Sequence, residues 1–257
     1  MPKALITGAS YGIGKEFAIQ LARIGYNLIL VSRSKDKLTE VKNEVEKFNI
    51  KARVISMDLS TQDAAEKLFS EVNEDIDILI NNAGLGLFGE AIESNTKEVE
   101  NIINLNIQTL TKLSILFGKK MAEKGKGNIL NIASMVALFP FPYFAVYSAT
   151  KSFVLTFSLA LRNELKNKGV NVSCLLPGFT KTNFDNNAKI NSEKYKHFSN
   201  KMGMDAKTVA KIGLKAMFKK KSLVIAGIQN KIFAFLIKIL PQSLITSIVK
   251  KQLNSLI

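Results

Sequence analysis

A glycine-rich turn between a predicted strand and a predicted helix constrains the fold more than any other feature of the chain. The strand ends at Thr7, and the letters T-G-A-S-Y-G-I-G place glycines at positions 8, 12 and 14. Gly8 permits a tight turn, Gly12 lets the backbone approach a pyrophosphate, and Gly14 lets the helix pack closely. The N–H groups at the start of the helix then face the anion. An ordinary loop is the alternative, but the position of the glycines favours a dinucleotide site. We assign to this site Gly8, Ser10, Tyr11, Gly12, Ile13 and Gly14.

The rest of the chain alternates short apolar runs with longer segments of helical period. Most runs are continuous in Val, Ile and Leu, as expected for parallel strands buried on both faces by helices. The predicted strands are Ala4–Thr7, Asn27–Ser32, Arg53–Met57, Ile78–Asn81, Asn128–Ala133, Asn171–Leu176 and Leu223–Ala226. The predicted helices are Gly14–Ile24, Lys35–Phe48, Gln62–Asn73, Thr96–Glu123, Phe144–Lys168 and Ala206–Lys219. The pattern predicts a single α/β domain.

The second predicted strand ends in V-S-R-S, which bears on the choice of nucleotide. A domain that binds NAD usually has Asp or Glu at this point, about 20 residues beyond the glycines, to bind the ribose 2′-hydroxyl. This chain has Arg33 instead, with Ser32 and Ser34 beside it. A guanidinium forms a charge-assisted fork to a 2′-phosphate, so NADP is favoured over NAD. Asp36 is the alternative acid, although it also suits the N-terminus of the following helix.

Two further strand ends carry polar residues. In M-D-L, Asp58 could accept a hydrogen bond from the adenine amino group while Leu59 flanks the ring. In N-N-A-G, we expect Asn81 to be structural, and we expect Asn82, Ala83 and Gly84 to line the nucleotide site.

Tyr147 and Lys151 are four residues apart in a predicted helix, so the phenol and the ammonium lie on one face, one turn apart. Ser134 follows the buried run that ends at Ala133. A hydroxyl at a strand end and a phenol on the next helix can converge on one carbonyl. A cation nearby lowers the pKa of a phenol, which is otherwise too weak a base at neutral pH. We therefore expect Tyr147 to exchange the proton in a hydride transfer. The alternative is a tyrosine that packs in the core.

With the glycine turn, N-N-A-G, Ser134, Tyr147, Lys151 and the pair Pro177-Gly178 in order, the chain resembles the short-chain dehydrogenase/reductase superfamily. The similarity covers residues 3–227 and favours a subgroup of 3-oxoacyl-thioester and steroid ketoreductases. It implies a Rossmann-type, doubly wound sheet of about seven parallel strands in residues 1–227 and an NAD(P)-dependent oxidoreductase.

The resemblance also implies roles for single residues. Tyr147 is expected to be the general acid/base, Lys151 to lower its pKa and hold the nicotinamide ribose, and Ser134 to polarise the substrate carbonyl. Asn106 matches the asparagine that bends a helix and holds a proton-relay water. The loop that closes over the nicotinamide matches Pro177, Gly178, Thr180 and Thr182. Thr180 is expected to contact the carboxamide, and residues 181–204 to form the substrate lid.

Other kinds of site are disfavoured by the composition. The only histidine, His197, lies in a polar segment, which leaves no base for a serine hydrolase and no histidine-based metal site. The only cysteine, Cys174, fits a buried strand in a reducing compartment. No apolar run reaches the length of a membrane span, and the chain opens directly in a strand, so we expect no signal peptide and a cytoplasmic protein.

The net charge of +15 is unevenly distributed. Residues 1–179 carry 21 basic and 18 acidic residues, whereas residues 180–257 carry 15 and 3. Solvated lysines are one explanation, and attraction of an anionic substrate or membrane surface is another. No nucleic-acid-binding motif is present.

Residues 228–257 form an amphipathic extension with two apolar stripes at helical spacing on either side of Pro241. Three placements stay open, namely packing on the domain, sealing a dimer, or contact with a membrane surface. The A-L-F-P-F-P-Y-F stretch near Ser134 supplies an aromatic wall that suits an apolar or acyl substrate. We expect an NADP-dependent reductase of a small-molecule carbonyl or alcohol that forms a homodimer or homotetramer. A catalytically silent NADP-binding regulator and a membrane-surface lipid ketoreductase are the alternatives.

Overall fold

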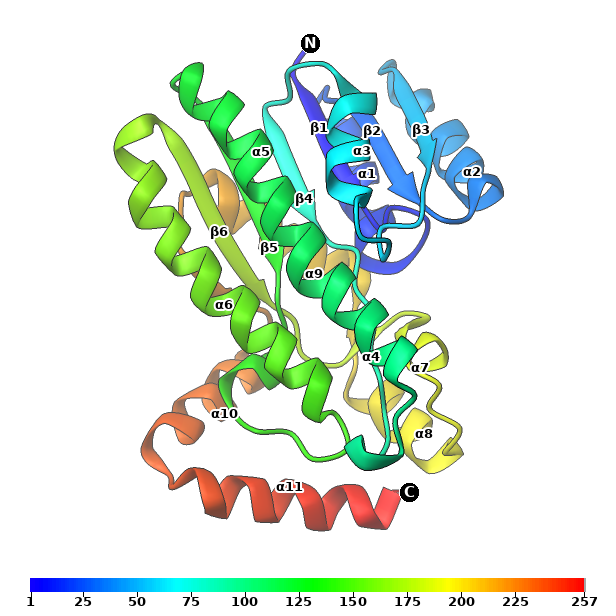
Figure 1. Cartoon of the computed structure of the whole chain (residues 1–257), viewed down its shortest axis with the longest axis vertical. Helices are drawn as coiled ribbons and strands as arrows, with labels where there is room; N and C mark the ends of the chain where they lie inside the picture. The colour runs from blue at the N-terminus through cyan, green and yellow to red at the C-terminus, as the bar shows by residue number, and fades with distance from the viewer. Residues whose placement is uncertain (257) are drawn as a thin grey trace.

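The computed structural model describes residues 1–256, and Ile257 lies outside the described residues. Its centre is a parallel sheet of seven strands in the order β3-β2-β1-β4-β5-β6-β9 (Figure 1). The strands are β1 Lys3–Thr7, β2 Asn27–Ser32, β3 Ala52–Ser56, β4 Ile78–Asn81, β5 Gly127–Ile132, β6 Val170–Leu176 and β9 Leu223–Ile225. Every neighbouring pair is parallel, which confirms the doubly wound α/β fold. The expected strands agree with these to within one residue at either end.

Helices cover both faces of the sheet (Figure 1). Their apolar stripes pack against the strands in two separate buried clusters. The helices on one face are α1 Gly12–Arg23, α2 Lys35–Val45 and α9 Ala206–Phe218, and those on the other are α3 Ala64–Val72, α5 Leu110–Glu123 and α6 Ala145–Leu165. Helix α4 Thr96–Ile103 leads toward α5 and packs against α6. Phe17 of α1 anchors the first core and Phe117 of α5 the second, and both side chains are fully buried. β4 and β6 are buried along their whole length, and they are apolar except for Asn81, Asn171 and Ser173. The side chains of these three residues form hydrogen bonds within the structure.

The order of the strands reverses between β1 and β4. The chain first builds β1, β2 and β3 in one direction and then returns to place β4 on the other side of β1. Loops at the carboxyl ends of β1 and β4 therefore part and leave a crevice, which is where open α/β sheets bind ligands.

Polar side chains inside the second half of the sheet pair with one another. Asn81 Nδ2 donates to Asn131 Oδ1 at 2.9 Å and to Ser114 Oγ at 3.0 Å, and Asn131 Nδ2 donates to Ser158 Oγ at 3.0 Å. This network joins β4 and β5 to the helices above them. The structural role expected of Asn81 is confirmed.

Two helical expectations need correction. The single helix expected from 96 to 123 is interrupted by a π-helical segment, Asn104–Thr109, between α4 and α5. Residues 181–204, expected to form the substrate lid and assigned no helix from the sequence, contain α7 Phe184–Asn187 and α8 Glu193–Met202, and a small parallel pair joins β7 Thr180–Lys181 to β8 Met204–Asp205. These helices are short and mostly polar, so the sequence carries little periodic signal.

The 3-10 turns are Glu46–Phe48, Ala91–Glu93, Met135–Leu138 and Lys166–Lys168.

The C-terminal extension forms two helices, α10 Ile228–Ile239 and α11 Gln242–Leu256, which meet at Pro241. They lie at the end of the molecule opposite the N-terminus, and α11 crosses below the body of the domain (Figure 1). Ile237 and Ile245 are buried where the extension packs on the domain, and the Tyr143 hydroxyl donates to Asn254 Oδ1 at 2.7 Å. Within residues 1–256, no helix combines the length and apolarity needed to cross a bilayer.

Candidate active site

A cavity of about 480 Å³ opens at the carboxyl ends of the strands, where β1 and β4 part. Residues expected at the site from widely separated segments of the sequence line it together. They are Gly8, Ser10, Tyr11, Gly12, Ile13, Arg33, Asp58, Leu59, Asn82, Ala83, Gly84, Ser134, Tyr147, Lys151, Pro177, Gly178, Thr180 and Thr182. Gly14 and Asn106 do not line the cavity themselves. Gly14 packs against Gly8 and Asn106 hydrogen-bonds Leu85, and both of these partners line the cavity.

The turn between β1 and α1 is tightly packed. Gly8 has a φ of +66°, and a Cβ added to Gly14 would lie 2.1 Å from the Gly8 carbonyl oxygen. The Asn82 side chain donates to the carbonyls of Thr7 at 3.0 Å and Gly8 at 3.1 Å. Close packing of α1 against the turn therefore depends on glycine at position 14, as the sequence predicted, and Asn82 holds the turn from β4.

Basic and hydroxyl groups line the cavity at the end of β2. Arg33 is exposed and forms no ion pair within residues 1–256, and Ser34 lies beside it in the wall. Lys37, one turn into α2, also lines this end and lies 5.8 Å from the centroid of the Tyr11 ring. The Ser32 hydroxyl is buried without a hydrogen-bond partner in the described residues. This region therefore offers two cations and an unpaired hydroxyl to an anionic ligand.

Asp58 lies in the same wall, beyond the end of β3. Its Oδ1 accepts hydrogen bonds from the Ser60 backbone at 2.9 Å and the Ser60 hydroxyl at 2.7 Å. These bonds fix the orientation of the carboxylate. Its contact with an adenine stays a prediction.

Tyr147 and Lys151 face the cavity from the first turns of α6, and Ser134 faces it from the loop after β5. Lys151 Nζ donates to the Ile132 carbonyl at 3.0 Å, which ties the helix to the end of β5. Tyr147 is buried in an apolar cluster with Phe144 and Tyr195, and it also lines the cavity. The ring therefore packs in the core, as the alternative expected, while it borders the cavity, and its role in proton transfer stays a prediction.

The two titratable groups of α6 are both shifted toward their neutral forms. Burial raises the pKa of the Tyr147 phenol to about 12, against a smaller lowering by the Ser134 hydroxyl. Burial lowers the pKa of the Lys151 ammonium to about 8. The sequence predicted a Tyr147 pKa lowered by Lys151. The direction in the structure is the opposite, because desolvation outweighs the one lowering contribution, which is the hydrogen bond with the Ser134 hydroxyl.

Asn106 occupies the π-helical segment and holds the loop after β4. Its Oδ1 accepts from the Leu85 backbone N–H at 2.9 Å, and its Nδ2 donates to the Leu85 carbonyl at 2.9 Å and to Thr150 Oγ1 at 3.0 Å. The helix irregularity predicted at this residue is present. A Cβ on Gly84 would lie 3.3 Å from Lys151 Nζ and 3.4 Å from Asn106 Oδ1, so both polar groups approach the same point of the loop.

The loop after β6 closes one side of the cavity. The Thr180 hydroxyl donates to the Gly178 carbonyl at 3.0 Å, and the Thr182 hydroxyl accepts from the Phe184 backbone at 3.2 Å. Thr182 also lies against Gly12, where an added Cβ would come within 2.9 Å of its methyl group. The loop thus touches the glycine turn directly. The hydroxyl proton of Thr180 is taken up by this hydrogen bond within the loop, and the contact of Thr180 with a carboxamide stays a prediction.

Aromatic rings surround Tyr147 at the other end of the cavity. Its ring centroid lies 5.6 Å from that of Phe144 and 5.3 Å from that of Phe184, and Phe144 lies 5.7 Å from Phe141. Tyr195 of α8 completes this wall, and burial raises its pKa. The aromatic wall expected from the stretch after Ser134 is therefore extended by the lid.

Three of the lining residues that the sequence did not predict bear on the chemistry of the site. Lys37 gave a usable signal, since it lies four residues beyond Arg33, in the first turn of α2. Asn230 and Phe233 come from α10, and nothing in their local sequence indicates that the extension reaches the cavity. His197 is exposed on α8 and does not line the cavity. No group of three or more metal-binding side chains occurs within the described chain.

Comparisons with known proteins agree with this geometry. Residues 2–193 match the family model described as short chain dehydrogenase. Over 185 residues the chain is 40% identical to a very-long-chain 3-oxoacyl-CoA reductase of Rattus norvegicus. The aligned region covers 70% of this chain and 59% of that protein. Over 216 residues it is 35% identical to a 17-beta-hydroxysteroid dehydrogenase type 3 of Mus musculus, covering 82% of this chain and 68% of that protein.

A solved structure of a short-chain dehydrogenase from Sphingobium yanoikuyae in complex with NADPH has a TM-score of 0.82 to this chain and 29% identity, over 94% of this chain and 97% of that one. The family match ends before α9, α10 and α11, so it does not cover the helix that supplies Asn230 and Phe233.

Proposed function

The chain belongs to the short-chain dehydrogenase family. On that basis we propose that it is an oxidoreductase of hydroxyl and keto groups, namely an NADP(H)-dependent ketoreductase with a hydrophobic, acyl-chain-bearing substrate. The observation that carries the proposal is the convergence of Ser134, Tyr147 and Lys151 on the cavity that the glycine turn also lines. The relatives named above are reductases or dehydrogenases of acyl-thioester and steroid substrates, which supports the substrate class.

The residues present fit a dinucleotide. The glycine turn leaves no room for side chains where a pyrophosphate would approach, and the end of β2 supplies Arg33, Lys37 and the unpaired Ser32 hydroxyl for a 2′-phosphate. The NADPH complex of a solved relative supports the same preference. When bound, the nicotinamide supplies or accepts the hydride. Thr180 and Thr182 would hold its carboxamide end, and Lys151 its ribose.

The chain's own residues manage the proton and the developing charge. A phenol with a pKa of about 12 stays protonated at neutral pH, so Tyr147 can donate to a carbonyl oxygen that becomes an alkoxide during reduction. Ser134 donates a second hydrogen bond to the same oxygen, which stabilises the charge where it develops. A positively charged Lys151 nearby makes the reverse step, proton removal by the phenolate, less costly. Asn106 acts on this group by holding the Leu85 loop beside Lys151.

The substrate end of the cavity favours an apolar chain. Phe141, Phe144, Tyr195 and Phe233 line it, and they come from the loop after β5, from the lid and from α10. Aromatic walls with few convergent polar groups bind and orient apolar ligands. A 3-oxoacyl thioester or a ketone of comparable size satisfies both the apolar wall and the two hydroxyl donors.

The test is NADPH oxidation, followed spectrophotometrically, against a panel of ketones that includes 3-oxoacyl thioesters, with the Tyr147→Phe variant as the control. Turnover that the variant lacks supports the reductase. Tight NADPH binding without turnover of any carbonyl would favour the alternative, a catalytically silent regulator.

We also propose a cytoplasmic location and a homodimer or homotetramer. Cell fractionation tests the location, and light scattering tests the number of subunits.

A further inference from the structure

The exposed side of α10 is apolar, although the helix already buries its other side. Ala234 and Ile237 pack on the domain, while four large apolar side chains recur at the spacing i, i+4, i+7, i+11 on the opposite side. These four are Ile228, Ile232, Phe235 and Ile239. Phe235 is 63% exposed and Ile239 is 61% exposed. An ordinary surface helix would place polar side chains here, so the stripe needs an explanation.

The apolar surface continues across the turn at Pro241. Leu236 and Leu240 extend it toward the turn, and Leu244 and Ile248 carry it onto the exposed side of α11. Both helices lie together at one end of the molecule (Figure 1). We call the exposed apolar residues of α10 and α11 the C-terminal face.

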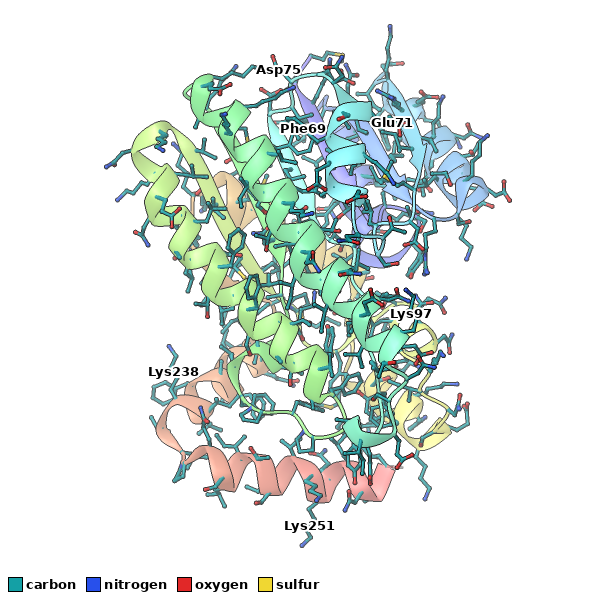
Figure 2. The ribbon with its side chains drawn as sticks, viewed as in Figure 1. Phe69, Glu71, Asp75, Lys97, Lys238 and Lys251 are labelled. Carbon is teal, nitrogen blue, oxygen red and sulfur yellow. The ribbon has the colours of Figure 1, made fainter. Side chains whose placement is uncertain are left out.

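Charge on this extension has one sign only. Residues 228–257 contain four lysines and no Asp or Glu, and none of these lysines forms an ion pair in the described part of the chain. Lys238 and Lys251 extend away from the body of the molecule (Figure 2). Lys231 precedes the second residue of the stripe, and Lys250 adjoins Lys251. The C-terminal face is therefore apolar in the middle and positively charged around it.

A second copy of the chain is a poor occupant of such a surface. In a two-fold contact the same face meets itself, so the lysines of each copy would approach those of the other with no carboxylate between them. An anionic bilayer satisfies both properties, because acyl chains accept the apolar residues and lipid phosphates attract the lysines. We propose that α10 and α11 dock this protein on anionic phospholipid membranes, with the C-terminal face in the interface.

The same helix joins this face to the active site. Asn230 and Phe233 line the cavity from α10, and the Phe233 ring packs edge-on against Phe139 with centroids 5.6 Å apart. Phe233 is itself 40% exposed, so one ring borders both the cavity and the C-terminal face. A lipid-dissolved ketone could then enter beside Phe233 without crossing water. This second part of the inference rests on the proposed function, whereas the docking does not.

Vesicle co-sedimentation of the full chain tests the docking. The protein is expected to sediment with vesicles of phosphatidylcholine and phosphatidylglycerol, to bind pure phosphatidylcholine at least about tenfold more weakly, and to dissociate in high salt. The double variant Phe235→Ser, Ile239→Ser should bind about tenfold more weakly than the wild type. The matched control is Ile24→Ser, Phe218→Ser, two exposed apolar residues outside the C-terminal face, which should bind as the wild type does.

A second pair of variants tests the charge. Lys250→Gln, Lys251→Gln should weaken binding to anionic vesicles by about tenfold and leave binding to neutral vesicles unchanged. The control Lys166→Gln, Lys168→Gln removes two exposed lysines from the turn after α6. Equal effects of the two pairs would overturn the proposal. So would equal binding of the wild type to neutral and anionic vesicles, or a dimer in light scattering that only the α10 variant dissociates.

Turnover of a small water-soluble ketone separates the two proposals. Vesicle binding without any turnover would leave the docking intact and remove the proposed function. Turnover without vesicle binding would do the reverse. If both hold, the Phe235→Ser, Ile239→Ser variant should keep the rate with the soluble ketone and lose rate only with a ketone dissolved in the vesicles.

Discussion

The ammonium nitrogen of Lys151 lies 5.7 Å from the centroid of the Tyr147 ring, and both groups are buried. The nitrogen donates to the Ile132 carbonyl, so α6 cannot rotate without breaking a contact to β5. The phenol is thereby held in the cavity wall next to Ser134. Burial shifts the pKa of both groups toward the neutral form, upward for the phenol and downward for the ammonium.

Replacing Tyr147 by Phe removes the proton donor and keeps the ring. We expect the reductive rate to fall by about 10²- to 10⁴-fold, the usual contribution of general acid catalysis, with NADPH binding little changed. Stopped-flow NADPH oxidation and NADPH fluorescence measure the two quantities. Tyr143→Phe is the matched control, because that hydroxyl bonds Asn254 and its ring does not line the cavity. Equal losses in both variants would contradict the assignment.

Replacing Arg33 by Asp should change the choice of nucleotide. A charge-assisted hydrogen bond contributes about 1.5–3 kcal/mol, so NADPH affinity should fall by about tenfold or more while NADH affinity changes much less. Titration calorimetry with both nucleotides measures the ratio. Lys35→Asp makes the same charge change two residues away, outside the cavity wall, and should leave the ratio unchanged. The same loss of affinity for both nucleotides would show that Arg33 does not contact a 2′-phosphate.

Lys151 should make stability depend on pH in the alkaline range. Its pKa is about 8 in the folded protein, below the ordinary value of 10.5, so between these values the unfolded chain binds the extra proton. The free energy of unfolding therefore rises with pH from about 8 to 10.5, and this gain is lost as the pH falls back toward 8. The free energy of unfolding of the wild type, relative to Lys151→Met, should rise by about 3 kcal/mol across the window. Urea denaturation at several pH values measures it, and a constant difference would refute the assignment.

Asn106 should be far more costly to remove than its neighbour Asn104. Asn106→Ala leaves the backbone N–H and carbonyl of Leu85 without their partner, and each buried unpaired group costs about 1–3 kcal/mol. We expect a loss of about 2–5 kcal/mol in the free energy of unfolding. Asn104→Ala in the same π-helical segment loses only the contact to Gln108 and should cost about 1 kcal/mol or less. Similar costs in urea unfolding would place the constraint on the segment rather than on Asn106.

Much of the fold was predictable because its strands are buried on both faces. The mostly apolar runs of β4 and β6 favour burial on both faces, and the turn at Gly8 sets the direction in which α1 leaves β1. Most of the candidate site could be predicted for the same reason, since the carboxyl ends of the strands must meet at one edge. The placement of each expected residue at the cavity is a property of the fold, while its contact with a ligand stays a prediction.

The parts that could not be predicted depend on contacts between distant segments. Phe233 faces the cavity only because α10 folds back beside the loop after β5, and a local stripe cannot report that. The direction of the Tyr147 pKa depends on how much of the ring is covered, which is a property of the packed structure. Asn106 lies in the π-helical segment and hydrogen-bonds Leu85, and the resemblance implied the irregularity of the helix but not this partner.

Cys174, in the middle of β6, is a natural probe for local unfolding of the central sheet. Its side chain is fully buried, and burial raises the pKa of its thiol to about 12, so neither access nor ionisation favours attack on a reagent. Labelling by a thiol reagent must then wait until β6 separates from its neighbours. The rate of thiol labelling therefore measures how often β6 separates from the neighbouring strands, without any engineered probe.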